Sequence, residues 1–293
     1  MIFEHEIPEG TKLYFGKSAK IKRMLESYAC DIFYRYGFEE IITPYFTYLE
    51  HQQNFSNRHI IRLSSQNNHQ ISLRYDSTID TIRTITKRLE RATSHQKWFY
   101  IQPVFSYPTN EIYQIGAESI HLQNLSDMIT IGLEILEHCN VRAFLQLNNV
   151  RILDLCITEL GLSKESYSSL SVQQIAQKAS FMKDILHIST LQDLEHFLPK
   201  APMFLHFEIE RLIYEAAACK YDQILVSLFE EPLVDYYDDM VFKVFDGNQI
   251  LLLGGKYKIQ NCFCCGFGLY TDNVIESILK RESKQDALQA LYI

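Results

Sequence analysis

Residues 112–118 read Ile-Tyr-Gln-Ile-Gly-Ala-Glu, and their alternation predicts a β-strand. Because side chains alternate across a strand, Gln114, Gly116 and Glu118 share one face, opposite an apolar face. Two interpretations of the polar face are open. Either water at the sheet surface satisfies these groups, or they line a pocket for a polar ligand and the glycine leaves room for that ligand. This strand by itself favours neither interpretation.

Outward from this strand, the pattern of apolar residues predicts helices and strands along the whole chain. Helices are expected over residues 18–36, 77–90 (with Asp76 or Ser77 as the N-cap), 125–138 and 150–160 and from Asp272 onward, and residues 163–228 are expected to be mainly helical. Strands are expected over residues 38–44, 71–74, 98–105, 142–147 and 261–268, with a hairpin of residues 240–245 and 249–253 around Asp246-Gly247-Asn248. Strand pairs interleaved with helices predict an α+β fold, with a largely antiparallel sheet flanked by helices.

The composition is typical of a globular chain, with 47% hydrophobic and 22% charged residues in a length of 293. No Pro/Gly/Ser-rich linker divides the sequence, so we expect one domain over residues 1–293. No stretch approaches the roughly 18 uninterrupted apolar residues that a membrane helix needs. The first residues lack the basic start and apolar run of a signal peptide. We therefore expect a cytoplasmic protein with no membrane segment.

The seven cysteines are expected to be reduced thiols, because a cytoplasmic protein rarely carries a disulfide framework. The run Cys262-Phe263-Cys264-Cys265 raises the question of a metal site. A zinc site usually needs a second pair of ligands at a suitable spacing, and the sequence offers none. Free cysteine also behaves as a small buried hydrophobe. Core packing is therefore favoured, and no metal is expected.

The net charge of −8 weighs against a nucleic-acid partner, because a protein that grips tRNA or DNA needs a cationic face. Basic residues do cluster over residues 17–23 and 87–91. Both clusters lie on predicted amphipathic helices, so a solvated helix face is the favoured interpretation of each. Binding of tRNA is not expected.

Residues 234–239 read Val-Asp-Tyr-Tyr-Asp-Asp and combine aromatic and acidic side chains. Tyrosines offer flat walls with a hydroxyl at the tip, and nearby carboxylates suit a cationic ligand. The alternative is a loop whose two tyrosines pack on the core. Asp76 and Thr78 add acidic and hydroxyl groups at a helix start, but no GxxxxGK[ST] phosphate-binding loop occurs.

Six segments, taken in order, resemble the catalytic core of histidyl-tRNA synthetase, a class II aminoacyl-tRNA synthetase, across nearly the whole chain. They are residues 36–44 (motif 1), 73–78 followed by Arg83 (the LRPExT segment), 105–118 (motif 2, ending in QxGxE), 234–242 (LDYYxxxVF), 254–257 (GGRYD) and 266–269 (the start of motif 3). Each motif alone is weak, but six in the right order and spacing carry the resemblance. It implies a class II synthetase-like antiparallel sheet flanked by helices, with no anticodon-binding domain.

The chain departs from the synthetase pattern where that family handles ATP. Ser106 stands in place of the motif 2 arginine, Pro232 in place of the arginine before LDYY, and Asn273 in place of the motif 3 arginine. The motif 2 loop has also shrunk to residues 107–113. Adenylate formation needs cations to offset charge on the transferring phosphates. We therefore expect a catalytically inactive paralogue that uses no cofactor.

The amino-acid pocket is kept better than the ATP site. By motif position, the resemblance implies that free histidine is held by Asp76, Thr78, Gln114, Glu118, Tyr237 and Tyr257. Asp76 replaces a glutamate of the family, so its reach to the α-ammonium is one methylene shorter. These departures suggest a protein that binds an amino acid without activating it.

Such a chain is similar to the family of synthetase-like regulatory subunits of ATP phosphoribosyltransferase. That resemblance implies a hetero-oligomer with a short-form catalytic subunit at the first step of histidine biosynthesis, with histidine as a feedback effector. It also implies a homodimer through the motif 1 region. Two alternatives stay open: an orphan synthetase paralogue that binds an amino acid or a protein without catalysis, and a minimal histidine-activating enzyme.

Overall fold

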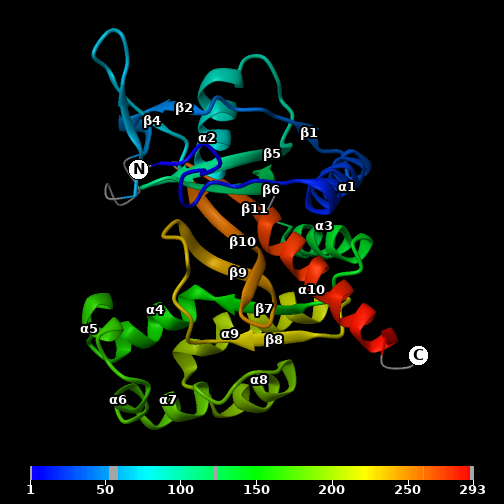
Figure 1. Ribbon diagram of the computed structural model, residues 1–293. Helices are drawn as coiled ribbons and strands as arrows, with labels where there is room; N and C mark the ends of the chain where they lie inside the picture. The colour runs from blue at the N-terminus through cyan, green and yellow to red at the C-terminus, as the bar shows by residue number, and fades with distance from the viewer. Residues whose placement is uncertain (1, 53–58, 122–123, 260, 291–293) are drawn as a thin grey trace. The chain divides into compact units, whose positions relative to one another are not determined.

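The computed structural model describes residues 2–52, 59–121, 124–259 and 261–290 (Figure 1). The chain packs as two compact units, which are Met1–Leu122, Ile131–Val141 and Gly266–Ile293 for the first and Gln123–Thr130 and Arg142–Cys265 for the second. Helix α3 (Leu125–His138) and strand β11 (Cys262–Tyr270) contribute residues to both units. That residues 1–293 form one synthetase-like domain stays a prediction.

The first unit is built on an antiparallel hairpin of β5 (Lys97–Ser106) and β6 (Asn110–Ile120), which confirms the strand predicted over residues 112–118. A short strand, β1 (Glu39–Glu40), pairs in parallel with β5. The strand expected over residues 38–44 is this short because backbone pairing with β5 ends at Ile41, whose N–H donates to the Phe99 carbonyl, and from Thr43 the backbone bonds to side chains. The Thr43 N–H donates to Gln102 Oε1 at 3.2 Å, for example.

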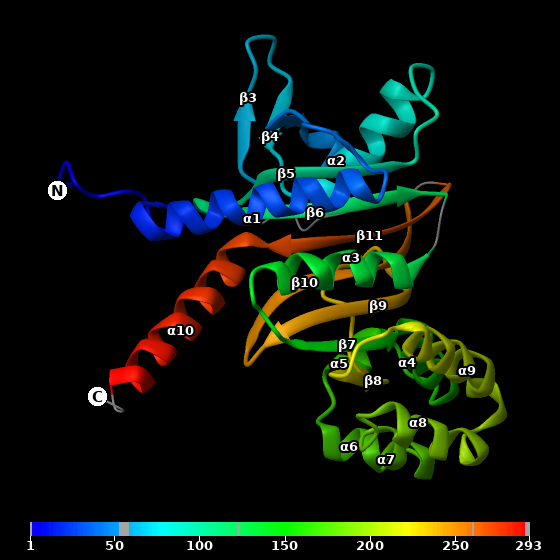
Figure 2. The ribbon, with the colours of Figure 1, turned by 90° about the vertical axis from the view of Figure 1, so that its right-hand side faces the viewer.

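Helices cover both faces of the β5–β6 hairpin. Helix α1 (Gly16–Arg35) runs along the strands (Figure 2) and stacks Phe33 on Phe99 with ring centroids 4.7 Å apart. Phe99 lies opposite Ala117, so α1 covers the apolar face of β6. Helix α10 (Thr271–Ala290) lies beside α1, and the Tyr14 hydroxyl bonds to its Asp272.

The polar face of β6 meets helix α2 (Ser77–Arg83). Of the two predicted N-cap candidates, Asp76 and Ser77, the N-cap is Asp76, and its Oδ1 accepts the Ile79 N–H at 2.8 Å. The helix expected over residues 77–90 continues beyond Arg83, but as the π-helical turn η2 (Thr84–Leu89). A three-stranded sheet of β2 (Phe46–Tyr48), β4 (Gln70–Leu73) and β3 (Arg62–Ser64), in that order, and the 3-10 turn η1 (Leu49–Gln52) complete the unit.

The guanidinium of Arg74 is fully buried in the first unit and bonds to two separate segments. Its Nη1 donates to the Thr43 carbonyl at 2.9 Å and to Gln102 Oε1 at 3.0 Å, and its Nε donates to the Pro103 carbonyl at 3.0 Å. Burial lowers the pKa of this arginine because it disfavours the charged form. Arg74 thereby fastens the end of β4 to the motif 1 segment and to β5.

The second unit contains the strands β10 (Gln249–Ile259), β9 (Tyr237–Asp246), β7 (Phe144–Asn149) and β8 (Ile224–Ser227), in that order. Only the pairing of β7 with β8 is parallel among these. The predicted hairpin is confirmed, since Asp246 pairs with Gln249 across Gly247, whose φ is 59°. Helices α4 (Val150–Glu159) and α9 (Met203–Ala218) pack on this sheet.

Residues 163–228 are mainly helical, as predicted. They contain α5 (Lys164–Ser168), α6 (Val172–Ala176), α7 (Ser180–Ile185), α8 (Leu191–Phe197), the 3-10 turn η3 (Leu198–Lys200) and α9. The end of the range is a correction, because residues 224–227 form strand β8. A short apolar run such as Ile-Leu-Val fits a buried strand as well as a helix, so periodicity could not separate them.

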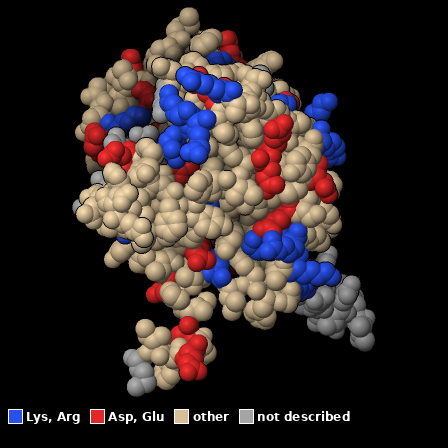
Figure 3. All heavy atoms as spheres, turned by 90° about the horizontal axis from the view of Figure 1, so that it is seen from above, with Lys and Arg blue, Asp and Glu red and all other residues tan. Residues whose placement is uncertain are grey.

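The cysteines, candidate metal ligands, helix apolarity and surface charges are considered in turn. Cys264 and Cys265 are fully buried. Among residues that the structure describes, no group of His, Cys, Asp or Glu side chains could hold a metal ion. In the same part of the chain, no helix has the length and apolarity to cross a membrane. On the face in Figure 3, basic and acidic side chains form small separate patches among uncharged residues.

Replacing Arg74 tests its structural role. Arg74→Met should lower the free energy of unfolding by about 3 to 5 kcal/mol, because it removes the donor to the buried carbonyl oxygens of Thr43 and Pro103. Arg91→Met, at an exposed position, should change it by less than about 0.5 kcal/mol. Urea unfolding of both variants measures the difference, and equal stabilities would contradict this role.

Candidate functional site

Glu118, on β6, is the centre of a buried polar set in the first unit. Its Oε1 accepts the Thr78 hydroxyl at 2.7 Å and the Tyr100 hydroxyl at 3.3 Å, and those two hydroxyls lie 3.3 Å apart. The Glu118 side chain is fully buried. Water at a sheet surface therefore does not satisfy this carboxylate, because hydroxyl groups from α2 and β5 contact it directly.

The two glycines beside Glu118 make room for protein side chains. A Cβ at Gly116 would overlap the ring of Tyr100, and a Cβ at Gly266 would overlap the Glu118 carboxylate. This corrects the interpretation that the glycine of β6 leaves room for a ligand, because the space at Gly116 is filled by Tyr100. The glycines allow the carboxylate and the tyrosine to approach the strands closely.

Asp76 stands two residues before Thr78, at the start of α2. Burial and the nearby Asp80 charge together raise the pKa of Asp76 to about 6, although the N–H groups of Ile79 and Thr78 act to lower it. Tyr270, at the end of β11 in the same unit, has a raised pKa because of its burial and the Asp76 charge. Asp76 is thus a carboxyl that changes its charge close to neutral pH.

Gln114 lies on the same face of β6 as Glu118 and is half-buried. It pairs in register with Gln102 of β5. A strand rises about 3.3 Å per residue, so the backbone positions of Gln114 and Glu118, four residues apart on β6, are about 13 Å from each other. In the first unit the structure brings Thr78 and Glu118 together and places Asp76 nearby, while Gln114 sits further along the strand.

Tyr237 and Tyr257 lie together in the second unit, as cross-strand partners of β9 and β10. Their ring centroids are 5.9 Å apart in an edge-to-face arrangement, and both side chains are buried. Tyr236 adds a third ring, 4.9 Å from Tyr237 and 5.2 Å from Tyr257. Gly255 lies beside this cluster, where a Cβ would come within 3.0 Å of Tyr237 Cδ1.

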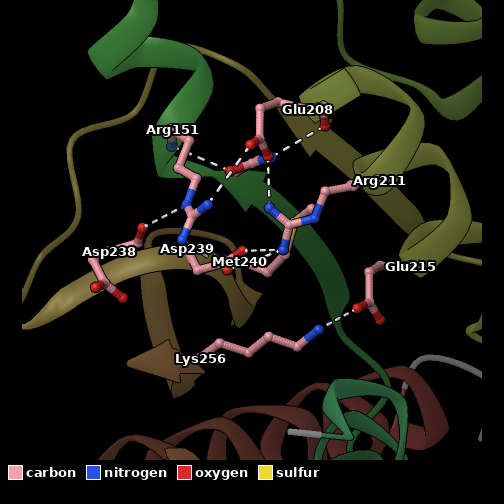
Figure 4. A network of polar contacts seen from close by, with 9 residues as sticks. Arg151, Glu208, Arg211, Glu215, Asp238, Asp239, Met240 and Lys256 are labelled. Carbon is pink, nitrogen blue, oxygen red and sulfur yellow. Dashed lines mark hydrogen bonds and ion pairs between the residues drawn. The ribbon is translucent and has the colours of Figure 1, made fainter. Parts of the chain in front are cut away.

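The aspartates that follow the tyrosines are held by protein groups (Figure 4). Arg211 Nη2 donates to both carboxylate oxygens of Asp239, at 2.7 and 2.9 Å, and Arg151 Nη2 lies 3.4 Å from one of them. Burial raises the pKa of Asp238. The expectation that these carboxylates suit a cationic ligand therefore needs correction for Asp239, whose charge is already matched by arginines.

The structure also locates the three residues that replace synthetase arginines. Ser106 ends β5 and pairs with Asn110, so the turn of this hairpin consists of residues 107–109. Asn273 lies in the first turn of α10, and Pro232 lies between β8 and β9. None of the three side chains carries a positive charge at the position where the family resemblance implies a phosphate contact.

Known proteins resemble this chain over nearly its whole length. The family described as histidyl-tRNA synthetase matches residues 15–274. The ATP phosphoribosyltransferase regulatory subunits of Helicobacter hepaticus and Wolinella succinogenes are each 47% identical to it, and the matches cover 95% and 96% of this chain and 100% and 98% of theirs. The chain belongs to this family of regulatory subunits.

The fold of this regulatory-subunit family member is that of class II synthetases. A crystal structure of an ATP phosphoribosyltransferase regulatory subunit/histidyl-tRNA synthetase from Bacillus halodurans C superposes with a TM-score of 0.78. The two are 17% identical, and the match covers 95% of this chain and 84% of the other. The predicted α+β class with a class II synthetase-like sheet is confirmed, although the sheet is mixed because β1 and β8 pair in parallel.

Sequence reasoning missed three groups at these sites: Tyr100, Tyr236 and Arg211. Tyr100 lies opposite Gly116 across the β5–β6 pair, so a correct register would have revealed it. Tyr236 lies in the quoted motif of residues 234–239, but the resemblance implies only its neighbour Tyr237 as a histidine contact. Arg211 is 28 residues from Asp239, and no local pattern signals such a pair.

Because the pKa of Asp76 is raised in the folded chain, the free energy of unfolding should depend on the charge of this carboxyl between about pH 4 and pH 6. Asp76→Asn keeps an oxygen for the Ile79 N–H but removes the ionisable group. Because the pKa is about 6 in the folded chain against the usual 3.8, the wild-type carboxyl stabilises the fold most below about pH 4 and loses this contribution as pH rises through about 6. The free energy of unfolding should therefore shift in favour of the variant by roughly 2 to 3 kcal/mol between those limits. Parallel curves for both proteins, from urea unfolding at each pH, would contradict the assignment.

Proposed function

We propose that this chain is the non-catalytic regulatory subunit of an ATP phosphoribosyltransferase. In this proposal it assembles with a short-form catalytic subunit and acts at the first step of histidine biosynthesis. The observation that carries the proposal is that Ser106, Pro232 and Asn273 stand where the resemblance implies phosphate-binding arginines, while acidic, hydroxyl and tyrosine side chains stand where it implies histidine contacts. The names of the relatives, matched over at least 98% of their lengths, agree with it.

Loss of catalysis follows from the charge at the former ATP positions. Developing charge on a transferring phosphate is stabilised by fixed cations, and Ser106, Pro232 and Asn273 supply none. The turn of residues 107–109 is also too short to carry the basic loop that the resemblance implies. The net charge of −8 and the mixed patches in Figure 3 weigh against tRNA as a partner.

Histidine is the proposed effector, and the six predicted residues are its proposed contacts. In the first unit, the carboxylates of Glu118 and Asp76 and the Thr78 hydroxyl suit an α-ammonium group, and Gln114 offers an amide. In the second unit, the rings of Tyr237 and its partner Tyr257 suit a flat or cationic group. Histidine would regulate by binding the two states of the assembly with unequal affinity.

A homodimer through the motif 1 region is also proposed. Large apolar side chains stay exposed in and beside this region: Ile42 is 74% exposed, Phe46 57% and Tyr48 52%. They line a groove whose volume is about 850 Å³, together with Ile41 and Pro44. Exposed apolar surface of this extent marks an interaction site in many proteins.

The activity of the same organism's catalytic subunit tests the function. Addition of this chain should raise the phosphoribosyltransferase rate, and histidine should reverse that increase. The control is the catalytic subunit alone, with and without histidine. A catalytic subunit that is fully active and histidine-sensitive alone, and unchanged by this chain, would move the assignment to an orphan paralogue. Histidine-dependent pyrophosphate exchange by this chain would instead establish an active enzyme.

Glu118→Gln tests the histidine contacts. The amide keeps an acceptor for the Thr78 hydroxyl but loses the charge that would hold an α-ammonium. We expect histidine to bind about 10- to 100-fold more weakly, by calorimetry. Glu159→Gln, at an exposed position of α4, should bind like wild type. Unchanged affinity of the Glu118 variant would remove this residue from the proposed contacts.

A further inference from the structure

The amide of Gln102, on β5, is buried and bonds at one end only. Its side chain is 3% exposed. The oxygen Oε1 accepts hydrogen bonds from Arg74 Nη1 at 3.0 Å and from the N–H and the hydroxyl of Thr43, each at 3.2 Å. The nitrogen Nε2 is buried and has no hydrogen-bond partner among the residues that the structure describes. A buried donor without an acceptor is costly, so Nε2 calls for a partner beyond these residues.

The three donors around Oε1 fix which way this amide points. In the reversed orientation, Nε2 would face the donors of Arg74 and Thr43, and donors would meet donors. The guanidinium itself is fully buried, and its other N–H groups donate to the carbonyls of Thr43, Pro44 and Pro103. The cation is thus closed to direct contact with a ligand, whereas the N–H groups of Gln102 still lack an acceptor in the described chain.

Strand register places Gln102 on the polar face of the β5–β6 hairpin. It pairs with Gln114, and Tyr100 pairs with Gly116. Residues that pair across two strands share a face of the sheet. The Tyr100 hydroxyl bonds to Glu118 on this face. Gln102 therefore lies on the same face as the proposed histidine contacts of β6, directly opposite Gln114.

The proposed contacts of the first unit offer an amino acid more acceptors than donors. Glu118 and Asp76 suit the α-ammonium group, and Thr78 already gives its hydroxyl to Glu118 at 2.7 Å. Of the four contacts in this unit, Gln114 alone carries an N–H donor. A carboxylate taken out of water needs hydrogen bonds that offset the loss of its hydration. Gln102 supplies such donors on the same face.

Arg74 makes Gln102 a better donor to an anion. A hydrogen bond accepted from a cation polarises the amide, and hydrogen bonds in a chain strengthen one another inside a protein. The charge of Arg74 therefore favours an anion at Gln102 Nε2, although the guanidinium itself is fully buried. A neutral amide thus presents part of the effect of a buried cation.

We infer that Gln102 is a further contact of the effector and donates from Nε2 to the α-carboxylate of histidine. This inference rests on the proposed function and assigns the carboxylate contact of the same site. The acidic groups then hold the α-ammonium end of the ligand, and the Arg74–Gln102 pair holds its carboxylate end. An ordered water on Nε2 is the competing explanation, and it predicts no dependence on the carboxylate of the ligand.

The contact is tested with Gln102→Glu and with two ligands, histidine and histamine, of which histamine lacks the carboxylate. The variant keeps an oxygen that accepts from Arg74 and Thr43, and it replaces the N–H donors with a second oxygen. The guanidinium beside it favours the charged form of this carboxyl. The matched control is Gln66→Glu, in the exposed turn between β3 and β4 of the same unit. Calorimetry measures the Kd of each ligand, and urea unfolding checks that each variant folds.

The readout is the Kd for histidine divided by the Kd for histamine. We expect Gln102→Glu to raise this ratio at least about tenfold, because the carboxylate of histidine loses a donor and meets a like charge. Gln66→Glu should leave the ratio as in wild type. An unchanged ratio in Gln102→Glu would overturn the contact, since a merely structural role or a bound water affects both ligands alike.

The wild-type chain gives a second test that does not depend on how the variant folds. The contact requires wild type to bind histidine more tightly than histamine, and equal affinities would exclude a donor to the carboxylate. A wild-type chain that binds neither ligand would instead refute histidine as the effector, which is a failure of the proposed function. Wild-type binding of histidine together with an unchanged ratio in Gln102→Glu would refute the assignment of Gln102 alone.

Discussion

The buried guanidinium of Arg74 is the interaction on which the first unit depends. It bonds to the Thr43 carbonyl, and on β5 to the Pro103 carbonyl and the Gln102 side chain, so the end of β4, the motif 1 segment and β5 meet at one cation. The chain passes directly from Arg74 to Asp76 at the start of α2. The position of the polar set around Glu118 is therefore fixed by the same cation that fastens motif 1 to β5.

Arginine is absent from some positions where the family resemblance implies it and present at others where it bonds within the fold. Where the synthetase resemblance implies arginines that hold phosphates, neutral residues stand. Where arginines persist, as at Arg74 and Arg211, their donors point to carbonyls or carboxylates of the protein itself. The positions at which the resemblance implies cations for a substrate carry none, whereas the cations of Arg74 and Arg211 join elements of the fold.

Local patterns predicted most helices and strands, and narrowed the N-cap of α2 to Asp76 or Ser77, because spacing and capping are properties of neighbouring residues. Motif order predicted the fold. Partners that lie far apart in the sequence escaped prediction. The filling of the space at Gly116 by Tyr100 depends on strand register, and the pairing of Arg211 with Asp239 depends on how α9 packs on β9. Strand β8 was missed because its run is short.

The close approach of Tyr100 to Gly116 constrains the order in which this chain can evolve. Any side chain at position 116 overlaps the tyrosine ring, so a larger residue there requires a smaller one at position 100 beforehand. The reverse order passes through a variant in which two groups occupy the same space. Mutational change at this position of β6 is therefore tied to a shift or a change of the side chain opposite it on β5.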